Sequence, residues 1–210
     1  MGWNRLGTPS YTRVTQHPGL LRAVQYQRGL LLRLLVRVPL RSRNYREMRL
    51  GENLYQDAHG HWLLHFQGAE LKIDTRKGRV NTYQLDLTAL FPELIPDLER
   101  FVREYRPRLP HADTAPQVFL TRHGRPFRDG SLKSELAACV FKYTEQPFYP
   151  HRIRTIWATE FIARTGDFST AAYMLGDTVE VVFREYQELL DTVHQQKASQ
   201  VLAGLLAGVR

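Results

Sequence analysis

Residues 52–87 constrain the fold most, because they have the composition of β-strands while the segments on both sides have helical periodicity. The runs HWLLHF and RVNTYQLDL are strand-like, and the turn signals DAHG, FQG and RKGR bound them. A small antiparallel sheet of about three strands is expected there. The predicted fold class is mainly α with a small antiparallel β-sheet (α+β).

Helical patterns occupy the remaining ordered segments. From Pro18 to about Val38, leucines recur at helical spacing with arginines between them, and Pro39 ends the pattern. The run VFLTRHGRPF is expected to form a short strand and a turn. Further helices are expected through NYREMRL, in PELIPDLERFVREYRPRL up to Pro107, in SLKSELAACVFKYTE, from His151 to Arg164, in STAAYMLG ended by Gly176, and in EVVFREYQELLDTVHQQ.

The chain has features of a protein of a reducing compartment. Its single cysteine, Cys139, excludes a disulfide within the chain. The start MGWNRLGTPSYTR has no apolar signal core, and the most apolar run, GLLLRLLVRVPL, is interrupted by arginines and too short to span a bilayer. We therefore expect a cytoplasmic or nucleoid-associated protein.

The formal net charge of +8 is concentrated in one segment. A local excess of arginine suggests a polyanionic partner, with nucleic acid as the first candidate. The alternative is a solvated helix face that keeps the protein soluble. Between residues 22 and 50, eight arginines stand against one acid, Glu47; the arginines are at positions 22, 28, 33, 37, 41, 43, 46 and 49.

The run PHRIRTIW places His151 and Arg154 three residues apart, so that both lie on one face of a helix. A guanidinium fork binds two oxygens of a phosphodiester and keeps its charge at any relevant pH. His-x-x-Arg alone is a weak signal, because an ordinary surface helix explains most of its occurrences.

Order and spacing make the signal specific. Arg41 lies in VPLRSR, a lysine-bearing hairpin follows, then come His151 and Arg154, and Tyr186 stands nine residues after Asp177 in MLGDTVEVVFREY. This series resembles the catalytic domain of tyrosine recombinases (the phage-integrase family). That family carries an Arg, a Lys on a β-hairpin, His-x-x-Arg, a Leu-Gly-His turn and a Tyr nine residues later.

The resemblance covers nearly the whole chain and implies a domain plan. Residues 18–195 would form the catalytic domain, and residues 1–17 an N-terminal arm or linker. Residues 196–210 would be a C-terminal tail that docks on a neighbouring protomer. The implied partners are double-stranded DNA and further copies of the chain, from dimer to tetramer, on paired sites.

The resemblance also implies roles. Arg41 and Arg154 would clamp the scissile phosphate, and Tyr186 would attack it to give a 3′-phosphotyrosyl link. Lys72 would protonate the departing 5′ oxygen, and His151 would assist proton transfer or orient the phosphate. Because the covalent link retains the phosphodiester energy, neither a metal nor a cofactor is implied.

Several assignments have alternatives. Lys77 is the second candidate for the general acid, although its place in the turn RKGR favours plain solvent exposure. Asp177 stands where the family has His, so it either caps the following helix or orients Arg154, His151 or the Tyr186 hydroxyl. Thr155 stands where many members have a second His.

Aromatic residues at helical spacing are usually core, so Phe183 and Trp157 are predicted to be buried. Without the upstream elements, Tyr186 would be assigned to the core as well; with them, we predict a nucleophile. The DNA phosphates are expected to contact further basic residues, namely Arg43, Arg46, Arg76, Lys77, Arg79 and Arg152.

Two other functions are alternatives to recombination: a recombinase-like DNA-binding module without catalysis, and DNA relaxation of the type IB topoisomerase kind.

His59, His61 and His65 would share one face of a strand and could bind zinc. No Cys or carboxylate completes a known zinc spacing, so solvent-facing polar positions are expected instead.

Overall fold

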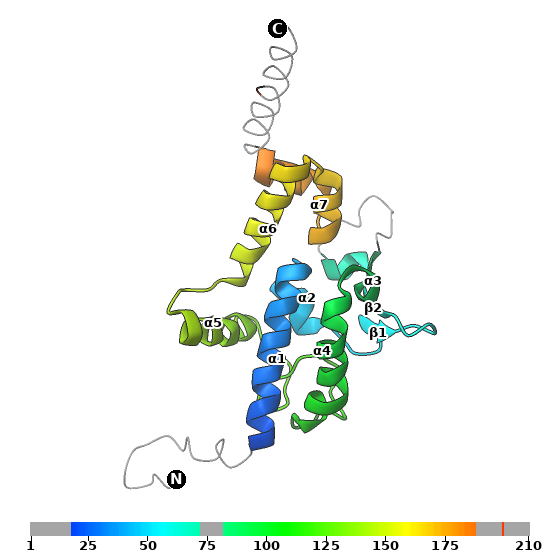
Figure 1. The fold of residues 1–210 in the computed structure, drawn as a ribbon, viewed down its shortest axis with the longest axis vertical. Coiled ribbons are helices and arrows are strands. Elements are labelled where there is room, and N and C mark those ends of the chain that lie inside the picture. Colours follow the sequence, from blue (N-terminus) through cyan, green and yellow to red (C-terminus); the bar gives the residue numbers. More distant parts are fainter. Residues whose placement is uncertain (1–17, 72–81, 188–198, 200–210) are drawn as a thin grey trace, which may run out of the picture.

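The structure is a computed structural model that describes residues 18–71, 82–187 and 199. A long helix, α1 (Pro18–Arg37), runs through the middle of the molecule, with the small sheet to one side (Figure 1). Helices α6 (Pro150–Thr165) and α7 (Phe168–Leu175) lie together at one end of the view, beyond the C-terminal end of α1. The predicted mainly α fold with a small antiparallel sheet is confirmed.

Helix α1 follows the predicted leucine spacing and buries Leu30, Leu31, Leu34 and Leu35 in the main core. Its hydrogen bonds end where the Val38 N–H donates to the Leu34 carbonyl at 2.7 Å, because the next residue is a proline without an N–H. The following helix, α2 (Ser42–Glu47), is shorter than predicted.

Helix α2 ends early because the backbone becomes extended at Met48. The next residue, Arg49, forms an isolated β-bridge with Gln117.

The sheet has three antiparallel strands in the order β1 (Leu54–Gln56), β2 (Trp62–Phe66) and β3 (Tyr83–Asp86). Leu64 of β2 pairs with Leu54 on one side and with Leu85 on the other, and all three side chains are buried. The β1–β2 turn is the predicted DAHG turn.

In that turn, the Asp57 carboxylate accepts from the N–H groups of His59 and His61, and Gly60 adopts a φ of +85° that favours glycine.

The three histidines of this region do not act as one cluster. His65 lies in β2, whereas His59 and His61 lie in the turn, and the His61 Nδ1 is 2.7 Å from the Asp86 carboxylate of β3. Among the described residues, no group of His, Cys, Asp and Glu is placed to hold a metal ion. His61 is therefore a member of an ion pair at the sheet edge.

The ion pair between His61 and Asp86 should make the stability of the fold depend on pH. The hydrogen bond and the charge of Asp86 raise the pKa of His61 above its ordinary value of 6.5. While Asp86 is ionised, the pair therefore stabilises the fold fully below pH 6.5, and this stabilisation is lost as the pH rises through the folded-state pKa of His61. We expect the NMR titration midpoint of the His61 ring to lie above 6.5 and to fall back toward it in Asp86→Asn.

Asparagine can still accept from the Ala89 N–H, as Asp86 does when it caps α3 (Leu87–Leu90), so the variant isolates the charge. Equal midpoints in both proteins would contradict the assignment.

A nearly continuous helical run follows the sheet, as predicted up to Pro107. It consists of α3, the 3₁₀ turn η4 (Pro92–Leu94), α4 (Ile95–Arg100), the π-helical η5 (Phe101–Tyr105) and the 3₁₀ turn η6 (Arg106–Arg108). At its end, the buried Arg106 side chain donates to the carbonyls of Ala112, Ala115 and Gln117, which fixes the following loop.

The predicted strand in residues 118–127 is wrong: only an isolated bridge between Leu120 and Pro126 is present in this described stretch. The physical reason lies in α1. The buried Gln27 amide donates to the Leu120 carbonyl at 2.7 Å and accepts from the Leu120 N–H at 3.0 Å. A side-chain amide thus takes the two hydrogen bonds that a neighbouring strand would supply.

The C-terminal helices α5 (Ser131–Thr144), α6 and α7 follow the prediction, and residues 179–187 are helical. Helices α6, α7 and 179–187 form a second, smaller core around Ala158, Ile162 and Leu175. The main core gathers α1, α2, the sheet, α4 and α5. The prediction that Phe183 belongs to the core is wrong: the residue is 45% exposed, although its ring lies 5.4 Å from that of Phe168.

Candidate active site

The first candidate residue, Arg41, lies between α1 and α2 at the N-cap position of α2. Its Nη1 donates to the carbonyls of Leu71 at 3.2 Å and Gly176 at 3.3 Å. The side chain is 29% exposed, so part of the guanidinium faces solvent. Arg41 therefore ties the main core to the turn after α7 and keeps an accessible edge.

Arg154 lies in the second turn of α6, and its side chain is only 7% exposed. Its Nη1 donates to the carbonyls of Pro39 at 2.7 Å and Leu175 at 2.6 Å. Burial, with the charge of Arg41 second, lowers the pKa of Arg154 to about 10. The guanidinium therefore remains charged at neutral pH and joins the two cores.

Asp177 lies between the two arginines. One carboxylate oxygen accepts from Arg41 Nη2 and the other from Arg154 Nη2, and the side chain is 6% exposed. The helix-capping alternative for Asp177 is wrong, because the Thr178 hydroxyl accepts from the Val181 N–H at 3.3 Å. The neighbouring threonine caps the last helix, and Asp177 bridges the arginine pair.

Tyr186 lies in helix 179–187, and it is 8% exposed. Its hydroxyl lies beside Thr155, whose own Oγ1 donates to the His151 carbonyl at 3.2 Å. Burial raises the pKa of Tyr186, while Thr155 and the Arg154 charge act in the opposite direction. The phenol is therefore neutral at pH 7 and needs a base before it can act as a nucleophile.

Two further described candidates, His151 and Arg152, take no part in the arginine–carboxylate contacts. His151 lies in the first turn of α6 with an exposed side chain, and within the described residues its imidazole makes no hydrogen bond or ion pair. Arg152 is exposed. Four basic candidates, Lys72, Arg76, Lys77 and Arg79, lie outside the described residues.

Comparison with known proteins gives structural matches. No family model and no curated protein matches the sequence. XerH site-specific recombinase bound to palindromic difH substrate, in a post-cleavage complex, matches with a TM-score of 0.57 and 13% identity over 90% of this chain and 52% of that one. Its pre-cleavage complex with difH matches with 0.51 and 14%, over 83% and 49%. XerA recombinase matches with 0.56 and 14%, over 95% and 66%.

The chain has the fold of a tyrosine recombinase catalytic domain. It spans about half the length of XerH and 66% of XerA. At 13–14% identity the likeness concerns the fold, which agrees with the one that the ordered motifs imply.

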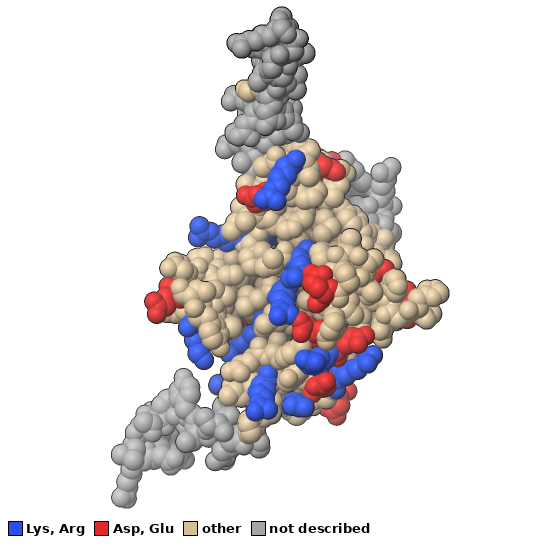
Figure 2. Space-filling model, viewed as in Figure 1, with Lys and Arg blue, Asp and Glu red and all other residues tan. Residues whose placement is uncertain are grey.

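In this recombinase fold, the arginine-rich segment is largely paired with acids. Figure 2 shows basic and acidic side chains next to one another on the visible face, without a continuous basic patch. Arg43 pairs with Glu47, and Arg46 with Glu47 and Asp129, so two predicted DNA contacts are engaged within the chain. Further pairs are Arg28–Glu135, Arg33–Asp97, Arg37–Glu93, Arg41–Asp177 and Arg49–Glu52.

Two residues of the site, Thr155 and Thr178, were not predicted from the sequence to be partners of the other site residues. Thr155 was noted only as a departure from the family pattern, and nothing in its position shows that it reaches the Tyr186 hydroxyl. Thr178 could have been found, because a threonine just before an apolar helical run is a typical N-cap.

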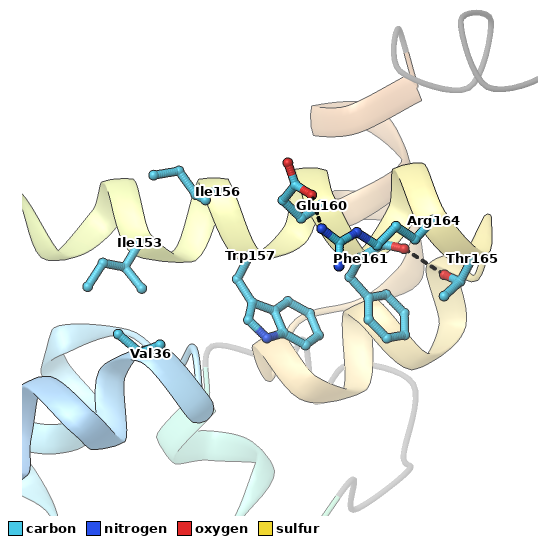
Figure 3. Close-up of a pocket in the computed structure, with 8 residues that line it drawn as sticks. All are labelled: Val36, Ile153, Ile156, Trp157, Glu160, Phe161, Arg164 and Thr165. Carbon is cyan, nitrogen blue, oxygen red and sulfur yellow. Dashed lines mark hydrogen bonds and ion pairs between the residues drawn. The ribbon is translucent and has the colours of Figure 1, made fainter. Parts of the chain in front are cut away.

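A separate groove lies on another face of α6, with a volume of about 470 Å³. Its lining is mostly apolar: Trp157 and Phe161 stack, and the only charged side chains are the ion pair Glu160–Arg164 (Figure 3). Trp157 is therefore half-buried: it packs against the small core and also lines the groove. Without an unpaired charge, the groove does not suit a phosphate. Its lining residues are Val36, Ile153, Ile156, Trp157, Glu160, Phe161, Arg164 and Thr165.

Proposed function

We propose that this protein cuts and rejoins double-stranded DNA in site-specific recombination, through a covalent 3′-phosphotyrosyl intermediate. One observation carries the proposal: Arg41 and Arg154 meet at one carboxylate, in the neighbourhood of Tyr186, although Arg41 and Asp177 are 136 residues apart in the chain. The likeness to XerH, whose structures hold difH DNA before and after cleavage, supports the same reading.

The chemistry follows from these residues. The Tyr186 oxygen attacks the scissile phosphorus, forming a P–O bond to the tyrosine while the bond to the 5′ oxygen breaks. The tyrosine proton passes to a base and the 5′ oxygen takes a proton from an acid, for which we propose His151 and Lys72. Arg41 and Arg154 stabilise the charge that grows on the non-bridging oxygens. A second 5′ hydroxyl reverses the step and reseals the strand.

The wider biology is part of the same proposal. The protein would act as a homo-oligomer on paired DNA sites in the cytoplasm or nucleoid, for integration of a mobile element. Within the described residues, no helix is long and apolar enough to cross a membrane. Residues 18–195 would be the catalytic domain, with residues 196–210 docking on a neighbouring protomer.

One observation favours a second candidate, a DNA-binding module without catalysis. The place between the two arginines is held by the carboxylate of Asp177, which repels a phosphate while it is there. DNA relaxation of the type IB kind has no such support from the site.

The deciding experiment uses nicked suicide duplexes, which release the 5′ fragment and trap the covalent protein–DNA adduct. Because the target is not defined by the site, a pool of mobile-element ends serves as substrate, and the adduct is detected on a denaturing gel. We expect a protease-sensitive adduct at the 3′ end of the cut strand. Tight, salt-sensitive DNA binding without any adduct would overturn the enzymatic proposal and favour the module.

A further inference from the structure

We propose that Asp177 is an autoinhibitory residue: its carboxylate occupies the anion site between Arg41 and Arg154, and a phosphate binds there only when the carboxylate leaves. This inference rests on the proposed function for its biological meaning. The anion site itself is a property of the two arginines and can be tested without catalysis.

The geometry of the contact resembles that of a bound phosphodiester. Each carboxylate oxygen receives one guanidinium, one from Arg41 and one from Arg154, as two non-bridging phosphate oxygens would. The bridging side chain is 6% exposed, so the ion pairs are shielded from solvent. The position that best suits the substrate anion is thus already filled by an anion of the protein.

The arginines do not depend on Asp177 for their placement. Main-chain carbonyls of Pro39 and Leu175 hold Arg154 Nη1, and those of Leu71 and Gly176 hold Arg41 Nη1. These four acceptors belong to the backbone and remain when the carboxylate is removed. Asp177 therefore neutralises the site more than it positions it.

The backbone of Asp177 is fixed, which keeps the carboxylate at the site. Its N–H donates to the Ala172 carbonyl at 2.9 Å and closes α7, while Gly176 has a φ of +59°. A Cβ at Gly176 would lie 3.0 Å from Leu71 and 3.1 Å from Leu40. The turn is therefore packed against the main core, and opening the site requires rotation of the Asp177 side chain or movement of the turn.

Asp177 and Glu185 together set the charge that a phosphate meets. Glu185 acts electrostatically on Arg41, Arg154 and Tyr186, but its side chain is exposed and does not bridge the arginines. Asp177 balances one of the two guanidinium charges by direct contact, and the exposed Glu185 adds a weaker attraction. Removal of Asp177 leaves an excess positive charge in a shielded position.

The test measures binding of inorganic phosphate to the full chain by thermal denaturation, in phosphate or chloride buffers of equal ionic strength. Asp177→Asn should bind phosphate about tenfold more tightly than wild type, because one buried negative charge has been removed. Its melting temperature should therefore rise more with phosphate. If Asp177→Asn is unfolded in chloride, Asp177→Ser takes its place. Refolding of the variant by added phosphate then reports the same phosphate binding.

Two controls separate the site from overall charge. Asp97→Asn removes the same charge on α4, where the carboxylate pairs with Arg33, and should leave phosphate binding as in wild type. Glu185→Gln removes a nearby, exposed charge and should give a smaller gain than Asp177→Asn. An equal phosphate response in wild type and Asp177→Asn, or a weaker one in the variant, would overturn the proposal and make Asp177 a positioning residue.

The phosphate-binding measurement does not depend on the recombinase reaction, so failure of this proposal and failure of the proposed function can be told apart. If phosphate binding behaves as expected but no protein–DNA adduct forms in any variant, the proposed function fails and the anion site stands. If the adduct forms in wild type and is slowed in Asp177→Asn, autoinhibition fails and the function stands.

Discussion

Tyr186→Phe should form no covalent adduct on a nicked suicide duplex, while folding and binding DNA like wild type. The change removes one oxygen, the atom that would attack phosphorus. The ring remains packed in the small core with Ala158 and Val182, and the lost hydroxyl lies beside Thr155. The free energy of unfolding should therefore fall by only about 1 kcal/mol.

The control is Tyr173→Phe. Tyr173 lies on α7, is 45% exposed, and its hydroxyl contacts the backbone of Gln84 in β3. The adduct should form in this variant as in wild type. An adduct that persists in Tyr186→Phe would show that another residue is the nucleophile. It would contradict the match of the last third of the chain to the recombinase motifs.

The sequence predicted well those parts of the fold that depend on local periodicity and on helix-ending residues. The α1 boundaries followed from leucine spacing and Pro39, and the end of α7 from Gly176. The three-stranded sheet followed from strand composition between turn residues. These features depend on interactions between residues that are close together in the sequence, so local patterns are enough to predict them.

Features that depend on distant side chains were missed. The amide of Gln27 replaces a strand beside Leu120, across 93 residues of chain, and no local pattern indicates this. Likewise, the arginines between residues 22 and 50 suggested a free basic surface, but seven of the eight pair with carboxylates, several of them from α4, α5 and the turn after α7. Charge counted along the chain is not charge displayed on the surface.

The candidate site was partly predictable for the same reason. Ordered spacing indicated Arg41, Arg154 and Tyr186, which the fold brings into one neighbourhood. The role of Asp177 could not be decided, because a residue before a helix can cap it or reach sideways. The hydroxyl of Thr178 performs the capping and leaves the carboxylate for the arginines.

Arg154→Ala should lower the free energy of unfolding by about 3–5 kcal/mol, the usual cost of removing one partner of a buried ion pair. The carbonyls of Pro39 and Leu175 lose their donor, and the shielded Asp177 carboxylate keeps only Arg41. Because Arg154 joins the small C-terminal core to the main one, the loss affects the contact between them. Chemical denaturation monitored by tryptophan fluorescence measures it.

Adduct formation should fall about 10²–10³-fold in the same variant, at a temperature where it is still folded, because one of the two phosphate donors is gone. Arg164→Ala is the matched control on the same helix: its side chain is 78% exposed and pairs only with Glu160, so the free energy of unfolding should change by less than about 0.5 kcal/mol. Arg154→Lys keeps the charge but lacks the forked guanidinium, so it should restore little of the stability and little of the adduct formation. A stable Arg154→Ala protein with wild-type adduct formation would contradict both roles of this arginine, and the site would then lose its central residue.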